Sequence, residues 1–326
     1  MAGGWKIDRD FGDNLQGQSL KSMQIVSHRK IYFSVSIILV LASLVSLLLW
    51  GLNLGIDFSG GTLIEIEFLG ERPDNQEIQE KLAGLELDQI VLQSTGQKGL
   101  ILRLKDIDEE THQMILTKLK ELDFQGESSS QIITEKRFES VGPLIGQELK
   151  RKTSWAILLA LVAIILYIAW AFRKISKPVA SWQYGLVAII ALFHDILITL
   201  GFFSVLGHYW NIEIGLPLVA AFLTILGYSV NNSIVIFDRS RENLLRSHWT
   251  DFEEIINQSI NQSMTRCFNT ALTTLFVLLA IFFLGGQSIK YFALALIVGI
   301  IIGTYSSIFV TSSLIVVWQR RKLKQG

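Results

Sequence analysis

The sequence is poor in the residues that build disulfides and metal sites. Its 326 residues contain one cysteine, Cys267, and five histidines that lack metal-ligand spacing. A single cysteine excludes an internal disulfide and any multi-cysteine metal site. The sequence also lacks a P-loop and a complete dinucleotide fingerprint, and the Gly60-Gly61 pair before a strand-like run predicts a turn. We therefore expect no metal, no cofactor, no use of ATP and no enzymatic activity.

The chain has no net charge but a large excess of apolar residues. Lys and Arg number 29, Asp and Glu number 29, 50% of the residues are hydrophobic, and the mean hydropathy is +0.41. An ordinary soluble enzyme is less apolar than this. Six windows reach or approach the roughly 20 apolar residues that a bilayer-spanning helix needs. They lie at about 31–50, 154–172, 182–206, 216–237, 269–285 and 290–318. The sequence predicts an α-helical polytopic membrane protein that contacts the lipid bilayer and not nucleic acid.

Basic residues predict which side of the membrane each segment occupies. They gather before the first window, between the second and third, after the fourth and after the sixth, including Arg29, Lys30, Arg173, Lys174, Lys177, Arg239, Arg241, Arg320 and Arg321. Such clusters are typical of cytoplasmic segments. We expect cytoplasmic termini at 1–30 and 319–326, an uncleaved first span at 31–50, an external segment at 51–150, and spans two to six within 151–318.

The external segment has the pattern of a small folded domain. A strand is expected at 62–68, a helix starts at Asp74 with Glu77 three residues later, and strands follow at 89–94 and 99–104. A second amphipathic helix at about 108–122 and a strand at 131–138 complete the order βαββαβ. That order predicts a ferredoxin-like α+β domain between the first and second spans.

An acid lies in the middle of the third span. Asp195, preceded by His194, is at a depth where an ionisable residue is a functional candidate. One interpretation gives Asp195 a part in proton transfer. The other is a buried acid that only hydrogen-bonds a neighbouring helix. His194 has the same two interpretations, since it also fits a simple donor to a carbonyl or to Asp195.

The fourth span carries unusual polarity. Asn231, Asn232 and Ser233 interrupt an apolar helix that ends in alternating charges from Asp238 onward. Polar side chains in hydrocarbon need partners from other helices or from water, so this segment faces a protein interior. The amides either join helices or form a polar wall along a pathway.

Two features of the last spans have less specific meanings. Residues 251–264 space apolar side chains along one face, which predicts a helix near 251–266 lying in the cytoplasmic interface, and Arg266 follows it. Arg266 has a snorkelling interpretation and a proton-coupling one. Gly299 and Gly303 form a small-xxx-small pair, which predicts tight helix packing.

Taken together, these motifs resemble the SecF branch of the SecD/SecF family of bacterial protein-export membrane proteins, in the resistance-nodulation-division superfamily. The resemblance runs from about residue 51 to 318. Its motifs are GIDFSGGT at 55–62, VGPLIGQEL at 141–149, FHD at 193–195, GYSVNNSIVIFDRSREN at 227–243, SMTR at 263–266 with NT at 269–270, and GTYSSIF at 303–309. It implies six spans and an external domain per half, with SecD supplying the other half.

The family resemblance implies a role in late-stage protein export in a bacterial plasma membrane or an internal energy-transducing membrane. External domains would hold a preprotein that emerges from the SecYEG channel, powered by the proton motive force, while SecA and ATP drive translocation itself. The family's fourth-span motif reads Asn-Asp, with an arginine matching Arg266 nearby. Here the pair is Asn231-Asn232, and an amide cannot change charge with a proton.

The missing acid leaves several mechanisms open. Proton coupling is retained through Asp195 with an acid of the SecD half, or the chain is a SecD scaffold without its own proton site. A resistance-nodulation-division exporter half is a further alternative, although its external domains are usually larger. An intramembrane protease is disfavoured, because Asp195 and Asp238 lack the flanking motifs of an aspartyl dyad.

Overall fold

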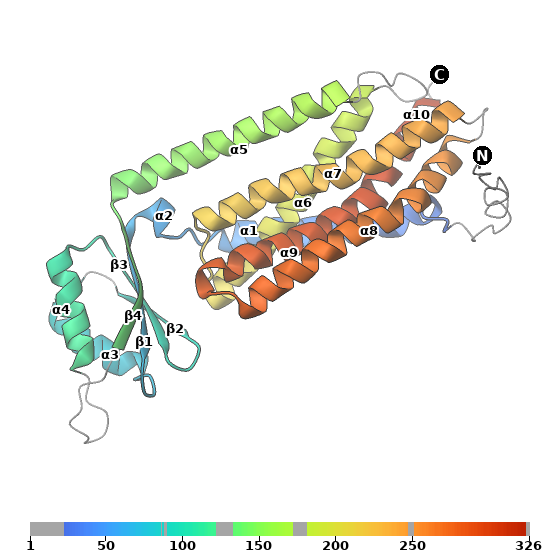
Figure 1. Cartoon of the computed structure of the whole chain (residues 1–326). Coiled ribbons are helices and arrows are strands. Elements are labelled where there is room, and N and C mark those ends of the chain that lie inside the picture. The colour runs from blue at the N-terminus through green and yellow to red at the C-terminus, as the bar shows by residue number, and fades with distance from the viewer. Residues whose placement is uncertain are drawn as a thin grey trace, which may run out of the picture. The chain divides into compact units, whose positions relative to one another are not determined.

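The structure is a computed structural model that describes residues 23–85, 87, 90–121, 133–171, 181–246 and 251–323 (Figure 1). It divides into two compact units. The helical unit comprises Met1–Leu49, Ala163–Phe202 and Ala221–Gly326, and the sheet unit comprises Trp50–Val162 and Phe203–Ala220. The expected basic loop with Arg173, Lys174 and Lys177 lies outside the described residues, as do residues 1–22 and 324–326.

Six helices in the described part of the chain are long and apolar enough to cross a membrane, which confirms the polytopic fold class. Short turn η2 (Val26–His28) leads into the first. Their bounds are α1 Arg29–Trp50, α5 Pro143–Ala171, α6 Ser181–Trp210, α7 Leu216–Arg246, α8 Phe252–Leu284, and a last span of α9 Gln287–Tyr305, the π-helical η4 Ser306–Thr311 and α10 Ser312–Leu323. Several begin before the apolar windows do. Helix α5, for example, starts at Pro143, whose fixed φ suits a first helical position.

The separate interfacial helix expected near 251–266 is not a separate element. Helix α8 runs without a break from Phe252 to Leu284, and Asp251 caps it by accepting from the backbone N–H of Glu253. No proline or glycine lies between these ends to stop the helix. Its apolar side chains Ile255, Ile256 and Ile260 are buried within the helical unit.

The sheet unit contains the predicted βαββαβ domain, here called the α/β domain. Its elements are β1 Gly61–Phe68, α3 Asn75–Leu82, η3 Ala83–Leu85, β2 Val91–Thr95, β3 Gly99–Leu104, α4 Glu109–Lys120 and β4 Ile133–Val141. The sheet is antiparallel with strand order β2-β3-β1-β4, the ferredoxin-like arrangement. Helices α3 and α4 cover one face (Figure 1). Their side chains close a core with β1 and β3 that includes Ile64, Ile66, Ile78, Leu100, Leu102, Ile115 and Leu119.

Capping residues and a glycine pair determine where these elements begin. Asp74 and Asp108 are the N-caps of α3 and α4, and Asp108 accepts from Thr111 N over 2.9 Å. Gly60 and Gly61 have φ values of 76° and 125°, between the short helix α2 (Ile56–Ser59) and β1. A Cβ on Gly61 would lie 2.7 Å from the carbonyl oxygen of Leu104. Gly60 therefore links α2 to β1, and Gly61, the first residue of β1, allows this strand to lie close to β3.

Candidate functional site

Asp195 is completely buried in the helical unit, on α6. Its carboxylate accepts hydrogen bonds from the hydroxyl of Ser229 on α7 and from that of Ser306 in η4, the latter over 2.8 Å. Two hydroxyl groups from different helices therefore converge on one carboxylate. Because burial of a polar group without hydrogen-bond partners is costly, these donors compensate for the burial of the carboxyl group.

His194 completes the environment of the carboxylate. Its Nδ1 lies 2.9 Å from Oδ1 of Asp195, and its side chain is only 8% exposed. Among the described residues, Nε2 of His194 has no hydrogen-bond partner. A histidine, a carboxylate and two hydroxyls are therefore in contact at one buried place in the bundle.

Small residues on α9 allow the helices to approach closely enough for these contacts. A Cβ on Gly303 would lie 3.2 Å from Cβ of Ser229 and 3.5 Å from Oδ2 of Asp195. One turn earlier, a Cβ on Gly299 would overlap the side chain of Ile225 on α7. Both glycines therefore lie where α9 meets α7, and any larger residue at 303 would push on the carboxylate site.

A second layer of polar contacts joins α7 to the last span. Ser233 and Ser307 are 3.1 Å apart at their hydroxyls, and Ser307 donates to the carbonyl of Ser229 over 3.2 Å. Asn232 is 1% exposed and donates from Nδ2 to Thr304 over 3.4 Å. The π-helical segment Ser306–Thr311 interrupts the last span beside the site, a position in which such segments are frequent.

The neighbouring amide of Asn231 has different surroundings. It is exposed and lines a cavity of about 390 Å³ between α5 and α7, together with Ala163, Ile164, Tyr167, Gly227, Val230 and Ile234. The two amides therefore have different neighbours. Asn232 contacts the last span, and Asn231 lies in an open pocket between α5 and α7.

Asp238 and Arg266 do not join the carboxylate site. Both are exposed, and in the portion of the chain that the structure describes, no hydrogen bond or ion pair links Arg266 to Asn232. The charged end of α7 contacts the start of α8 instead. Arg239 donates to Gln262 over 2.6 Å, and Asn243 donates to the hydroxyl of Ser259 over 2.9 Å.

Sequence reasoning identified Asp195, His194, Asn232 and Ser233 as candidates but missed Ser229 and Thr304. Ser306 and Ser307 entered only as part of the motif at 303–309. The signal that could have found Ser229 is its position two residues before Asn231 in the same polar segment. Single hydroxyls are a weak signal because they often bond to their own helix, as Thr199 does to the carbonyl of Asp195 over 2.8 Å.

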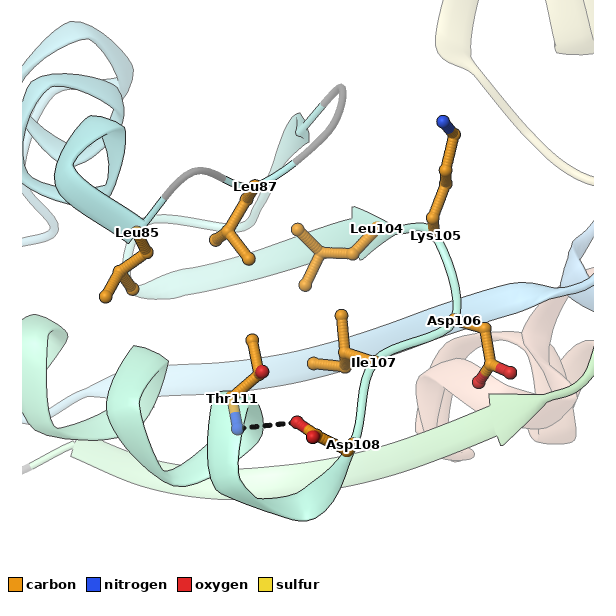
Figure 2. Close-up of a pocket in the computed structure, with 8 residues that line it drawn as sticks. All are labelled: Leu85, Leu87, Leu104, Lys105, Asp106, Ile107, Asp108 and Thr111. Carbon is orange, nitrogen blue, oxygen red and sulfur yellow. Dashed lines mark hydrogen bonds between the residues drawn. The ribbon is translucent and has the colours of Figure 1, made fainter.

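The α/β domain has a pocket of about 370 Å³ at the start of α4 (Figure 2). Leu85, Leu87, Leu104 and Ile107 form its apolar wall, with the carboxylates of Asp106 and Asp108 beside it. Both carboxylates already accept hydrogen bonds within the domain, Asp106 from Ser140 over 2.8 Å and Asp108 from Thr111. Nothing in this pocket therefore points to a ligand.

The sheet unit also brings two of the sequence motifs together. Gly146 in 141–149 packs on the segment 55–62, since a Cβ there would lie 3.0 Å from Gly60 N and 3.3 Å from the carbonyl oxygen of Phe58. Asp57 of the same segment accepts from the N–H of Leu216, the first residue of α7. The motifs thus surround the base of the α/β domain in one unit and Asp195 in the other.

Comparison with known proteins gives the family. The family described as "Protein export membrane protein SecD/SecF, C-terminal" matches residues 123–321, and "SecD/SecF GG Motif" matches residues 46–68. Protein translocase subunit SecF of Thermobaculum terrenum is 40% identical over 310 residues, which cover 92% of this chain and 95% of the relative. The corresponding subunit of Desulfurispirillum indicum is 41% identical over 296 residues, covering 89% and 90%.

A solved structure shows the same architecture. The crystal structure of SecDF, a translocon-associated membrane protein from Thermus thermophilus, has a TM-score of 0.76 and 33% sequence identity to this chain. The match covers 91% of this chain but only 38% of SecDF. The chain therefore belongs to the SecD/SecF family of protein-export membrane proteins, as a multi-pass subunit of the Sec protein translocase of the SecF kind.

Proposed function

We propose that this chain pairs with SecD and assists the late stage of preprotein translocation through SecYEG, using the proton motive force. Pairing with a second half is supported by the SecDF relative. SecDF of Thermus thermophilus is 37% identical over 283 residues, yet these make up only 36% of SecDF. SecD would provide the part of SecDF that this chain does not match.

The buried carboxylate of Asp195 is the observation that carries the proton-coupling part of the proposal. An acid with no exposed surface inside a membrane bundle is a functional candidate, and its role depends on the groups that contact it. Ser229 and Ser306 supply donors to the charged form, and His194 is a second group that can bind the proton. The site therefore has the parts of a proton relay.

Asn232 supports a second candidate function, a SecD scaffold without a proton site of its own. Its amide cannot titrate and donates to Thr304 inside the bundle, as a helix-joining residue would. In that case Asp195 would only hold α6, α7 and the last span together. The two candidates differ in one respect: a scaffold needs the hydrogen bonds of Asp195 but not its charge.

The orientation that accompanies the proposal follows from the basic residues. Arg29 and Lys30 precede α1, and Arg320 and Arg321 end the last span, so both termini are placed in the cytoplasm and the α/β domain outside. There the domain would contact a preprotein that leaves SecYEG while SecA supplies the ATP-driven steps. A change in the domain's orientation, linked to protonation of Asp195, would prevent the preprotein from sliding back.

Export into reconstituted vesicles tests the proposal. Asp195→Asn keeps the shape and one acceptor oxygen but removes the charge, and Asp238→Asn is the matched control because Asp238 is an exposed acid on α7. We expect Asp195→Asn to assemble with SecD and to lose the part of export that depends on the proton motive force, while Asp238→Asn behaves as wild type. Wild-type export by Asp195→Asn would instead assign the chain the scaffold role.

A further inference from the structure

The connection between α6 and α7 is bonded to the segment that precedes the α/β domain. Helix α6 ends at Trp210, and the next residue, Asn211, has a φ of 51° that turns the chain. The N–H of Ile214 then donates to the carbonyl of Asn53 over 2.7 Å, and the N–H of Gly55 donates back to Ile214 over 3.0 Å. Residues 53–57 and 212–216, all within the sheet unit, are called the α7 joint below.

Asp57 caps α7 from a distant part of the sequence. One carboxylate oxygen accepts the N–H of Leu216 over 2.7 Å, across a separation of 159 residues. The first N–H groups of a helix have no partner in the helix, and a carboxylate there is favourable for both hydrogen bonding and charge. Gly215 leaves space for this contact, since a Cβ there would lie 2.7 Å from Oδ2 of Asp57.

An ion pair between side chains links the segment between α6 and α7 to the sheet. Glu213 pairs with Arg103 of β3 over 2.7 Å, and the two side chains are only 18% and 15% exposed. Arg103 also donates to Gln93 of β2 over 2.6 Å. Backbone, carboxylate and ion-pair contacts therefore hold the start of α7 on the base of the α/β domain.

We infer that Asp57 is a positioning residue that fixes the start of α7 to the base of the α/β domain, so that a displacement of α7 is passed to β1. This inference rests on the proposed function. Helix α7 is continuous from Leu216 to Arg246 and carries Ser229, which donates to the carboxylate of Asp195. Strand β1 begins at Gly61, directly after the short helix that holds Asp57. Helix α7 thus runs without a break from the residue that Asp57 caps to the residue that contacts Asp195.

Comparing export with proton flux separates a positioning role from a proton-binding one. In vesicles containing the complete complex, we expect Asp57→Ala to keep proton flux and to lower export per proton by roughly fivefold, the equilibrium factor typical of a lost N-cap. Asp57→Asn retains an acceptor oxygen and is expected to stay within about twofold of wild type. Asp195→Asn is expected to lower flux and export together. A ratio of export to proton flux that stays at the wild-type value in Asp57→Ala would overturn the inference.

A reversible covalent link beside the joint tests it independently of the capping contact, by joining Asn53 of the joint to Gly207 in the last turn of α6. A Cβ on Gly207 would lie 3.1 Å from Cβ of Asn53, so a small outward shift brings the pair to the roughly 3.5–4.5 Å of a disulfide. In a Cys267→Ser background, Asn53→Cys with Gly207→Cys should crosslink on oxidation without loss of export. The same crosslink should restore export to Asp57→Ala, and a reductant should remove the rescue.

The outcomes of the crosslinking experiment are distinct. Export blocked by the crosslink in a chain that keeps Asp57 would show that the joint opens, which overturns the inference. Failure of the crosslink to rescue an assembled Asp57→Ala complex would also overturn it. If Asp195→Asn left flux and export unchanged, the proposed proton role would fail, while the rescue of export would still report on the joint.

Discussion

The carboxylate of Asp195 on α6 lies 2.8 Å from the hydroxyl of Ser306, which belongs to the π-helical segment of the last span. With Ser229 on α7, this contact joins α6, α7 and the last span at one buried acid. A change in the hydrogen bonds of that acid therefore alters contacts to two neighbouring helices at once.

Removing the hydroxyl donors tests whether they serve the charged carboxylate. A hydrogen bond to a charged group contributes about 1.5–3 kcal/mol, so we expect Ser306→Ala to lower proton-motive-force-dependent export by roughly tenfold. The double change Ser229→Ala and Ser306→Ala should lower it further. Export rates in vesicles at fixed external pH provide the measurement.

Ser312→Ala is the control for these variants. Ser312 follows the same π-helical segment, but its hydroxyl donates to the backbone carbonyl of Ser307 over 3.1 Å and not to Asp195. Equal losses in Ser306→Ala and Ser312→Ala would mean that the segment only needs its local hydrogen bonds, and the role assigned to the hydroxyl of Ser306 would be wrong.

Asn232→Asp is expected to be tolerated. The side chain is 1% exposed and donates to Thr304, and a protonated aspartate has nearly the shape of asparagine and can make the same donation. Co-purification with SecD and export in vesicles provide the measurements. A variant that neither assembles nor exports would show that the packing around residue 232 requires an amide.

Sequence patterns predicted the architecture well because it depends on long apolar runs and short-range periodicity. The six spans and the βαββαβ order needed no contact information. The continuity of α8 was missed because a polar stretch before an apolar run looks like a boundary, although nothing in 252–284 breaks a helix. Helix ends depend on caps and breakers, not on where hydrophobicity begins.

The candidate site was predicted only where a residue is conspicuous in its own helix. Asp195 and Asn232 stand out in apolar spans, whereas Ser229 and Thr304 do not, and their roles come from the partner across the interface. Asp57 was seen only as part of a motif. Its partner Leu216 lies 159 residues away and uses a backbone N–H, which no side-chain pattern reveals.

Gly299→Ala is expected to destabilise the protein. The added Cβ would overlap Ile225 on α7, and overpacking of this kind typically costs about 1–3 kcal/mol. Gly227→Ala on α7 is the matched control, because a Cβ there meets nothing within 4 Å, and alanine is favoured over glycine in a helix by about 1 kcal/mol. Thermal unfolding in one detergent should lower Tm for the first variant and leave or raise it for the second. Combining Gly299→Ala with Ile225→Ala should recover part of the loss, and equal Tm values for the two single variants would contradict the packing role.

Glu213→Gln is expected to change how stability depends on pH. Burial raises the pKa of the Glu213 carboxyl above its ordinary 4.5, and the favourable charge of Arg103 offsets this only in part, while nearby Asp57 adds to the rise. The folded chain then holds this proton more tightly than the unfolded chain does. The associated stability is fully present below pH 4.5, where both states are protonated, and is lost as the pH rises through the folded-state pKa. Glutamine does not titrate, so Tm of Glu213→Gln should fall less than that of wild type as the pH is raised through this window.

Asp108 provides a control of opposite sign, because its hydrogen bond with Thr111 lowers the pKa of its carboxyl below 3.8. Wild type loses the stabilisation by ionised Asp108 only as the pH falls through the lowered pKa of this carboxyl. Asp108→Asn should lack this part of the pH dependence of Tm. Parallel Tm curves for wild type and Glu213→Gln would mean that Arg103 offsets the burial of Glu213 completely.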